Sequence, residues 1–477
     1  MQAAAPLHIE SQTDAIREWG RARSYVWEKH RRAIVRLVGA VYWLLIFEGV
    51  LRKWVLPQFG KQLFFVRDPL VLLIYVLVLA RRTRLGQSRF LEIGAAFGIA
   101  GLVLSAVQLV TGTKLPFYFL VYGWRNYFLY LPLAFVIARY FNLWDLAQLA
   151  RRTLIVCIPM AALVFMQLQA GPRSPINRGL GKGINSGYLV HTSEYGVVRP
   201  AGTFTSDQGL TTFSASALAM ALSFWVLPVT SRPVGRLLLL VASACNLMCI
   251  GLSGSRGVLL WAAVIVGGAL CGLFFVRPKL HFRATLLIVA LLAGGAISLP
   301  ILFPRPTQAF LARWQEAGDA ESKAYGGGGV MARAAYEALS FRLLVVNTPA
   351  AGYGLGSAGN AAWELGVRND LIFFHNQDEV NAAETDWGRN ILELGPVLGC
   401  AFVLFRLSMV AFLLWTGLQT TRKTGHSFPW LFGLYVSVVL GFWQITGNGT
   451  LNGYGWLFVG FALAATRAAR RYERELL

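Results

Sequence analysis

The feature that most constrains this chain is a series of long apolar runs separated by short polar stretches. We count about twelve runs of roughly 17 to 25 residues, each long enough for a helix to cross the hydrocarbon core of a bilayer. Of the 477 residues, 56% are hydrophobic and 14% are charged, whereas soluble domains have roughly 25% charged residues. The sequence therefore predicts an all-α polytopic integral membrane protein. The expected spans are 34–56, 63–80, 90–111, 116–138, 152–169, 208–228, 236–253, 257–276, 284–303, 391–416, 428–446 and 454–468.

The basic residues between the runs predict the orientation of the chain. They lie in short clusters such as KHRR before the first span, RRTRLGQSR after the second and TRAARRYERE after the last. These clusters fall on one side of the predicted membrane, with Arg52 and Lys53 as an exception, and the positive-inside rule assigns that side to the cytoplasm. Both termini are then cytoplasmic. This distribution accounts for the net charge of +21 without nucleic acid as a partner.

The spans divide the chain into four regions. Residues 1–33 form a basic, cytoplasmic N-terminal extension, and 34–303 form a membrane domain with helices 1–9. Residues 304–390 form a large external loop between helices 9 and 10, and 391–477 hold helices 10–12 and a cytoplasmic tail. A polar loop of this length is uncommon and is usually functional or disordered. We expect this loop to hold or cover the functional site; a tolerated insertion is the alternative.

Two arginines on the external side are suited to phosphate. Arg199 stands just ahead of a predicted helix N-terminus, where its charge adds to the positive end of the helix dipole. Arg256 lies in a tight turn between Ser255 and Gly257. A guanidinium group matches phosphate oxygens through its planar fork of donors. We interpret Arg199 and Arg256 as diphosphate-binding residues, although a single interfacial arginine more often serves as a topological anchor.

Further polar candidates lie at the end of the external loop and within the membrane. The segment leading into the tenth span contains His375, Glu384, Asp386 and Arg389. Asp386 and Arg389 have the i, i+3 spacing of an ion pair, and a solvated acidic helix start is the alternative. Arg125 lies deeper within an apolar run. An intramembrane arginine is a functional candidate by default, with a structural role as the alternative.

Other polar residues need no functional explanation. Glu48, Arg67 and Asp68 lie near predicted span ends, where a local ion pair or snorkelling accounts for them. The five cysteines all lie inside apolar segments, and their spacing predicts neither disulfides nor a metal site. We expect no metal and no other cofactor.

Four motifs together resemble a known family. RPAGTF (199–204) precedes a span rich in small residues, GSRG (254–257) forms a turn between two spans, GYGLG (352–356) lies in the external loop, and ELGPVLG (393–399) opens the tenth span. In this order and placement they resemble the O-antigen ligase and O-antigen polymerase superfamily of bacterial envelope glycosyltransferases. The resemblance covers roughly residues 195 to 400.

The resemblance implies a fold, a location and a reaction. Members have about a dozen spans and a large periplasmic loop between the ninth and tenth, which places this chain in the bacterial inner membrane with its active site facing the periplasm. The reaction is an inverting transfer of sugar from an undecaprenyl-diphosphate-linked oligosaccharide donor to a glycan acceptor. Membrane lipids, chain-length regulators and export proteins are the expected further partners.

One departure from the family pattern favours a polymerase. Ligases of this family carry a His-Asn pair at a fixed distance before the glycine that corresponds to Gly395. Here the histidine position is Glu384, whereas a His-Asn pair occurs nine residues earlier, at His375. We therefore expect Glu384 to be the catalytic base, with His375 in reserve, and Asp386, Arg389 and Arg125 in supporting roles.

Two other functions stay open at this point. One is a ligase that transfers a lipid-linked glycan to lipid A core or another acceptor. The other is a polysaccharide transporter or a flippase of lipid-linked sugars, which also needs many spans and basic residues facing phosphate. A transporter is expected to place charges along a central path, whereas the candidate residues here gather at the external face.

Overall fold

The computed structural model describes residues 7–82, 88–110, 116–179, 198–226, 235–276, 341–358 and 385–476, with Leu85 and scattered positions between 282 and 315. Within these ranges the regular elements are helices and no β-strand occurs. The longer helices are α1 (Leu7–Val50), α2 (Asp68–Ala80), α3 (Arg89–Val110), α4 (Phe117–Phe128), α5 (Leu131–Tyr140), α6 (Leu143–Gln169), α7 (Asp207–Val226), α8 (Arg236–Leu252), α9 (Arg256–Val276), α15 (Asp386–Leu394), α16 (Pro396–Thr424), α17 (Phe428–Phe442) and α18 (Gly449–Leu476). Short helical turns η1 (Leu51–Val55), η2 (Pro57–Phe59) and η3 (Gln62–Phe65) join α1 to α2, and η4 (Pro175–Asn177) follows α6.

Seven helical segments among the described residues are long and apolar enough to cross a membrane. They are Val26–Val55, Gln62–Ala80, Arg89–Val110, Leu143–Gln169, Asp207–Val226, Arg256–Val276 and Pro396–Thr424. The apolar helices α8 and α17 are shorter. The chain is thus an all-α membrane protein, as the sequence predicts, and the count of twelve spans stays a prediction.

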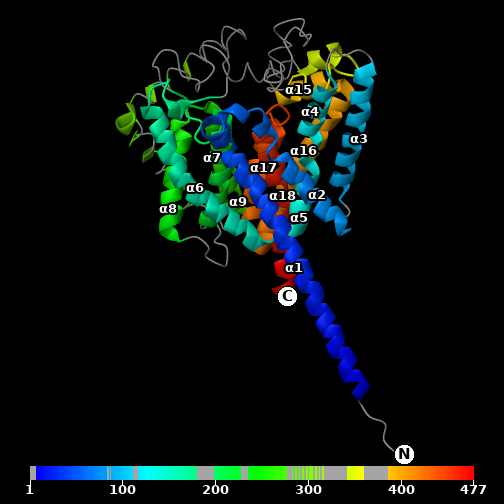
Figure 1. The fold of residues 1–477 in the computed structure, drawn as a ribbon. Helices are drawn as coiled ribbons and strands as arrows, with labels where there is room; N and C mark the ends of the chain where they lie inside the picture. The colour runs from blue at the N-terminus through cyan, green and yellow to red at the C-terminus, as the bar shows by residue number, and fades with distance from the viewer. Residues whose placement is uncertain are drawn as a thin grey trace, which may run out of the picture.

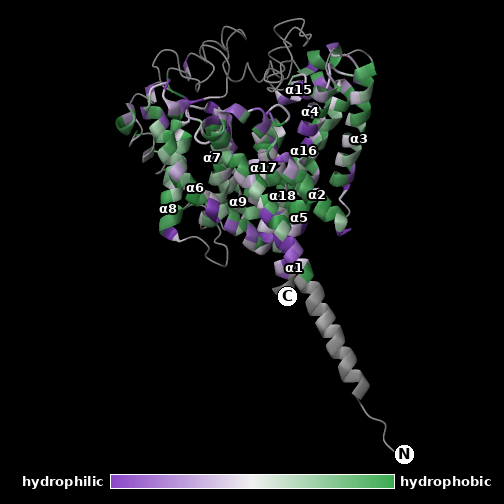
Figure 2. Ribbon diagram, in the orientation of Figure 1, coloured by the Kyte–Doolittle hydropathy of each residue, from purple (hydrophilic) through white to green (hydrophobic). Residues whose placement is uncertain are grey.

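The helices form one bundle with two polar ends. Figure 1 shows the N- and C-terminal ends of the chain at one end of the bundle and α15 at the other. Hydrophobic residues cover much of the helices, while hydrophilic residues gather toward the two ends (Figure 2). This is the distribution that a bilayer around the middle of the bundle requires.

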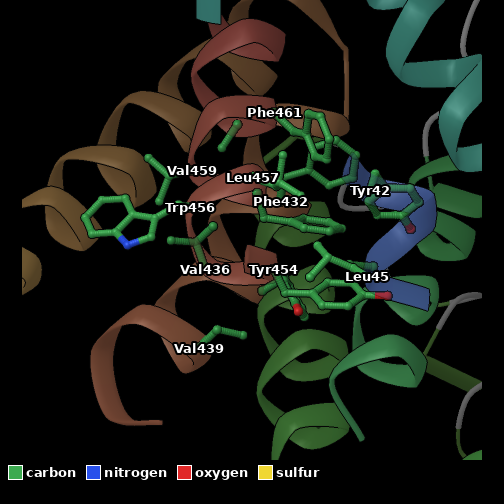
Figure 3. Packing of buried hydrophobic residues seen from close by; sticks show 14 of the residues in the cluster. Tyr42, Leu45, Phe432, Val436, Val439, Tyr454, Trp456, Leu457, Val459 and Phe461 are labelled. Carbon is green, nitrogen blue, oxygen red and sulfur yellow. The ribbon is translucent and has the colours of Figure 1, made fainter. Parts of the chain in front are cut away.

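Helix α18 lies at the centre of the bundle. It packs against α5, α16, α17 and α1, and its residues from Leu451 to Ala462 are all buried. Figure 3 shows aromatic side chains filling this region, where the ring of Tyr454 meets that of Tyr42 at 6.0 Å between centroids. At Gly460 a Cβ atom would lie 2.8 Å from the carbonyl oxygen of Ala134, so a small residue is needed for α18 to approach α5 closely.

Two predicted spans are interrupted. The predicted span 116–138 is divided into α4 and α5, because Pro132 stands in the first turn of α5, where a proline starts a helix but cannot continue one. The predicted span 391–416 is divided at Gly395, whose φ of +78° is a conformation that glycine adopts at little cost. The membrane-spanning helix therefore starts at Pro396, and α15 precedes it as a separate helix.

The ends of other predicted spans also shift. Helix α1 is continuous from Leu7 to Val50, so the predicted extension 1–33 and the first predicted span share one helix. Helix α17 ends at Phe442, four residues before the predicted end. Residues 443–449, which include the first residue of α18, are named here the α17–α18 connection.

Candidate functional site

The RPAGTF segment is held against the end of the first span. The ammonium group of Lys53 donates a hydrogen bond of 3.0 Å to the carbonyl oxygen of Gly202, and the hydroxyl of Thr203 donates one of 2.6 Å to the carbonyl of Ile46. A Cβ atom at Gly49 would lie 2.2 Å from the Thr203 carbonyl oxygen. Lys53, which the sequence leaves as an exception to the positive-inside pattern, thus positions the segment that carries Arg199.

Arg199 and Arg256 lie close enough to interact electrostatically. Arg199 forms an ion pair of 3.2 Å with Asp207, the first residue of α7, and each side chain is 27% exposed. Burial lowers the pKa of the Arg199 guanidinium, the charge of Asp207 opposes this, and the positive charge of Arg256 lowers the pKa further. Arg256 is the first residue of α9. Arg199, paired with the first residue of α7, therefore lies within electrostatic range of Arg256 at the start of α9.

The α17–α18 connection brings separate parts of the site together. The Trp443 ring packs on Gly257, where a Cβ atom would lie 2.5 Å from it. The side chain of Asn448 donates a hydrogen bond of 2.9 Å to that of Gln208, and Arg67 donates one of 3.1 Å to the Gly449 carbonyl. The connection thus touches the residue after Arg256 and the residue after Asp207.

Arg389 also lies against this connection. A Cβ atom at Gly447 would lie 1.4 Å from an Arg389 guanidinium nitrogen, so only glycine leaves room for that group. The Arg389 side chain is buried, with 2% of its surface exposed. Arg389 and the start of α9 therefore approach the same connection, and the supporting role of Arg389 stays a prediction.

The predicted ion pair of Asp386 with Arg389 is wrong. The Asp386 carboxylate pairs with the Arg406 guanidinium in α16, and it accepts hydrogen bonds from the backbone and side chain of Thr446, at 2.9 and 2.8 Å. Both charged groups are buried. A carboxylate and a guanidinium in a low-dielectric interior attract strongly, so Asp386 is a structural anchor between α15, α16 and the α17–α18 connection rather than a solvated helix start.

Arg125 has a structural partner. Its guanidinium donates two hydrogen bonds, both of 2.8 Å, to the Asp68 carboxylate. Glu48 pairs with Arg52 at 3.1 Å and with Arg67 at 2.7 Å. Glu48 and Arg67 therefore form an ion pair, one of the two explanations expected for them, whereas Asp68 pairs with the distant Arg125.

A further anchor fixes residues 351–358, which contain the GYGLG motif. The Glu393 carboxylate accepts hydrogen bonds of 2.9 Å from the backbone N–H groups of Gly356 and Ala358. The Gln108 side chain donates to the carbonyl oxygens of Ala351 and Glu393, at 2.6 and 3.0 Å. Its oxygen accepts a bond of 3.1 Å from the Leu355 N–H. Helices α3 and α15 therefore both hold this segment.

Glu393 is itself fully buried in α15, outside the candidate spans. Burial raises the pKa of its carboxyl group to about 7, against the opposing effects of the Arg389 charge and the hydrogen bonds from Gly356 and Ala358. Desolvation disfavours the charged form of a carboxyl group, which explains the direction. The group therefore titrates near neutral pH.

Sequence reasoning missed the α17–α18 connection, Arg406, Glu393 and Gln108. The connection had a signal, since GNG (447–449) interrupts two apolar runs with the residues of a turn. The other three lie in or beside apolar runs, and their partners are distant in sequence. The predicted bases Glu384 and His375 lie outside the described residues.

The arrangement is suited to binding an anion. Arg256 stands at the N-terminus of α9 and Arg199 pairs with the first residue of α7. At such positions backbone N–H groups and the helix dipole favour negative charge. Within the described part of the chain, no three His, Cys, Asp or Glu side chains are placed to share a metal ion. No family model, curated protein or solved structure matches the chain.

We expect Asp386→Asn to destabilise the protein by about 3 to 5 kcal/mol, because the Arg406 charge is then buried without its partner. The double change Asp386→Asn with Arg406→Met should recover much of this loss. Arg32→Gln is the matched control, since Arg32 makes an exposed pair with Glu28 worth about 1 kcal/mol or less. Unfolding midpoints in detergent give the comparison. An Asp386→Asn midpoint no lower than that of Arg32→Gln would contradict the anchoring role.

A second expectation concerns pH. The pKa of Glu393 is higher in the folded protein than its ordinary 4.5, so its contribution to stability is present below about pH 4.5 and is lost as the pH rises through about 7. This shift corresponds to about 3 kcal/mol. Unfolding midpoints measured between pH 5 and 8 should fall more steeply for the wild type than for Glu393→Gln. Gln108→Ala, which loosens the same segment without a titrating group, should keep the wild-type slope; equal slopes in all three proteins would refute the assignment.

Proposed function

We propose that the protein is a membrane glycosyltransferase that polymerises undecaprenyl-diphosphate-linked oligosaccharide repeat units into exopolysaccharide or O-antigen. In this proposal it acts at the periplasmic face of the bacterial inner membrane and both termini are cytoplasmic. The observation that carries the proposal is that Arg199, paired with the first residue of α7, lies within electrostatic range of Arg256 at the start of α9, beside the α17–α18 connection. The order of the four sequence motifs supports it.

The proposed topology has twelve spans. They are the seven long apolar segments and the shorter helices α8 and α17, together with α4 and α5 as one broken span, α18, and the predicted span 284–303. Under this topology Arg199, Arg256 and Arg389 share the face from which the 304–390 loop extends. A lipid-linked donor can then place its diphosphate at the membrane surface while its glycan extends into the periplasm.

The proposed mechanism uses guanidinium groups in place of a metal ion. An acceptor hydroxyl attacks the anomeric carbon of the donor sugar, and the bond from that carbon to the diphosphate breaks with inversion. Arg199 and Arg256 stabilise the negative charge that develops on the leaving diphosphate. The acceptor proton passes to Glu384, or to His375 if that residue is the base. Arg389 supports the site from α15.

The decisive experiment incubates the purified protein with a lipid-linked oligosaccharide in EDTA. A polymerase yields a ladder of longer lipid-linked chains, because the acceptor is a second copy of the same molecule. A ligase yields one transfer, and only when a lipid A core or another acceptor is added. Unchanged substrate under both conditions would refute a glycosyltransferase, and loss of activity in EDTA with recovery in Mg²⁺ would refute metal independence.

We expect Arg199→Lys and Arg256→Lys each to lower the turnover by about a hundredfold or more. Both changes keep the charge but lose the planar fork that binds phosphate oxygens, and removal of one stabilising donor typically costs about 10² to 10³ in rate. Arg173→Lys is the matched control, since Arg173 is exposed in the segment after α6, and it should keep wild-type turnover. Normal turnover in both Arg199→Lys and Arg256→Lys would leave these two residues as topological anchors.

The base is identified by a separate pair of variants. Glu384→Gln keeps the shape and polarity of the side chain but cannot accept the proton, so turnover should fall by about 10² to 10⁴. His375→Gln should have a smaller effect. Binding of the lipid-linked donor is measured in parallel and should stay unchanged in both proteins. A large loss in His375→Gln with normal turnover in Glu384→Gln would assign the base to His375.

A further inference from the structure

A cluster of arginines lies at the other end of the bundle, where α1 leaves it and α18 ends (Figure 1). Arg467 of α18 donates hydrogen bonds of 2.7 and 2.6 Å to the carbonyl oxygens of Arg139 and Phe141, at the end of α5. The positive charges of Arg31, Arg139 and Arg471 act on its guanidinium group. Three helices, α1, α5 and α18, therefore bring like charges to one place.

The described carboxylates near the cluster do not balance the positive charges of Arg139 and Arg467. Glu28 and Asp145 both pair with Arg31, at 2.9 and 2.5 Å. Among the described residues, neither Arg139 nor Arg467 has a carboxylate partner. Both side chains belong to exposed residues. Arg467 is held near Arg139 by its two hydrogen bonds. Like charges repel one another, and an anion that reaches both groups relieves this repulsion.

The cluster lies at the expected level of the membrane surface. Two exposed tryptophans flank it: Trp27, with 37% of its surface exposed, and Trp144, with 53%. They lie at the starts of the candidate spans Val26–Val55 and Leu143–Gln169, where tryptophan marks the boundary between the lipid headgroups and the acyl chains. The Trp27 ring stacks on Tyr140 at 5.4 Å, and the Arg139 guanidinium lies 5.5 Å from the Trp27 ring centre.

We propose that Arg139 and Arg467 form a binding site for the phosphate group of an anionic phospholipid. The phosphate binds between the two guanidinium groups, and Trp27 and Trp144 contact the glycerol and upper acyl chains. The fixed position of Arg467 favours a defined site over general attraction to a negative surface, since less side-chain freedom is lost on binding. The site is separate from the candidate functional site and does not depend on the proposed function.

The test measures lipid binding by native mass spectrometry of the full-length protein in a neutral detergent, titrated with phosphatidylglycerol or phosphatidylcholine. We expect phosphatidylglycerol to bind more tightly. Arg139→Gln should weaken it by about fivefold, and the double change Arg139→Gln with Arg467→Gln by about thirtyfold. Within the described part of the chain, the Arg139 side chain makes no hydrogen bond to the backbone, so the single variant keeps the test valid if the double variant folds poorly.

Arg422→Gln with Lys423→Gln is the matched control, because it removes two exposed charges from the last turn of α16. This variant should bind phosphatidylglycerol as the wild type does. An equal loss in the control and in the Arg139→Gln variants would show only general electrostatic attraction and would overturn the proposal. Equal binding of phosphatidylcholine and phosphatidylglycerol by the wild type would overturn it as well.

Discussion

Three ion pairs in the interior of the bundle join separate elements, and the arrangement of the helices depends on them. A lone charge in a bilayer is costly, whereas apolar contacts between helices are hardly better than contacts with lipid. The pairs Arg67–Glu48, Arg125–Asp68 and Arg406–Asp386 each join different elements. They therefore specify how the helices are rotated and shifted, which apolar packing alone specifies weakly.

The same pairs position the candidate site. Asp386 holds the start of α15 to Thr446 in the α17–α18 connection, and Arg67 holds the Gly449 carbonyl at its other end. The connection is then held at Thr446 and at Gly449. Gly447 lies between these two points and leaves space for the Arg389 guanidinium. A short turn with small residues can thus be both rigid and closely approached by arginine, which an anion-binding site needs.

Sequence patterns predict the class of fold well and its interior contacts poorly. The apolar runs indicate an all-α membrane protein because a bilayer imposes length and composition on each span. The i, i+3 spacing of Asp386 and Arg389 suggested a local pair, but Asp386 pairs instead with Arg406, which lies 20 residues away in α16 and which no local spacing points to. The Gln108 and Glu393 contacts with residues 351–358 join segments far apart in the chain, and no local pattern encodes them. Glu384 and His375 stay predictions.

The position of the α17–α18 connection has a consequence for biosynthesis. Arg67 is made early, but its partner at Gly449 follows 382 residues later. A chain interrupted during translation before this point contains Arg199, Arg256 and Arg389, yet it lacks the turn against which they are arranged. The candidate site is therefore completed only when residues 443–449 have been synthesised, and a shorter nascent chain cannot display it.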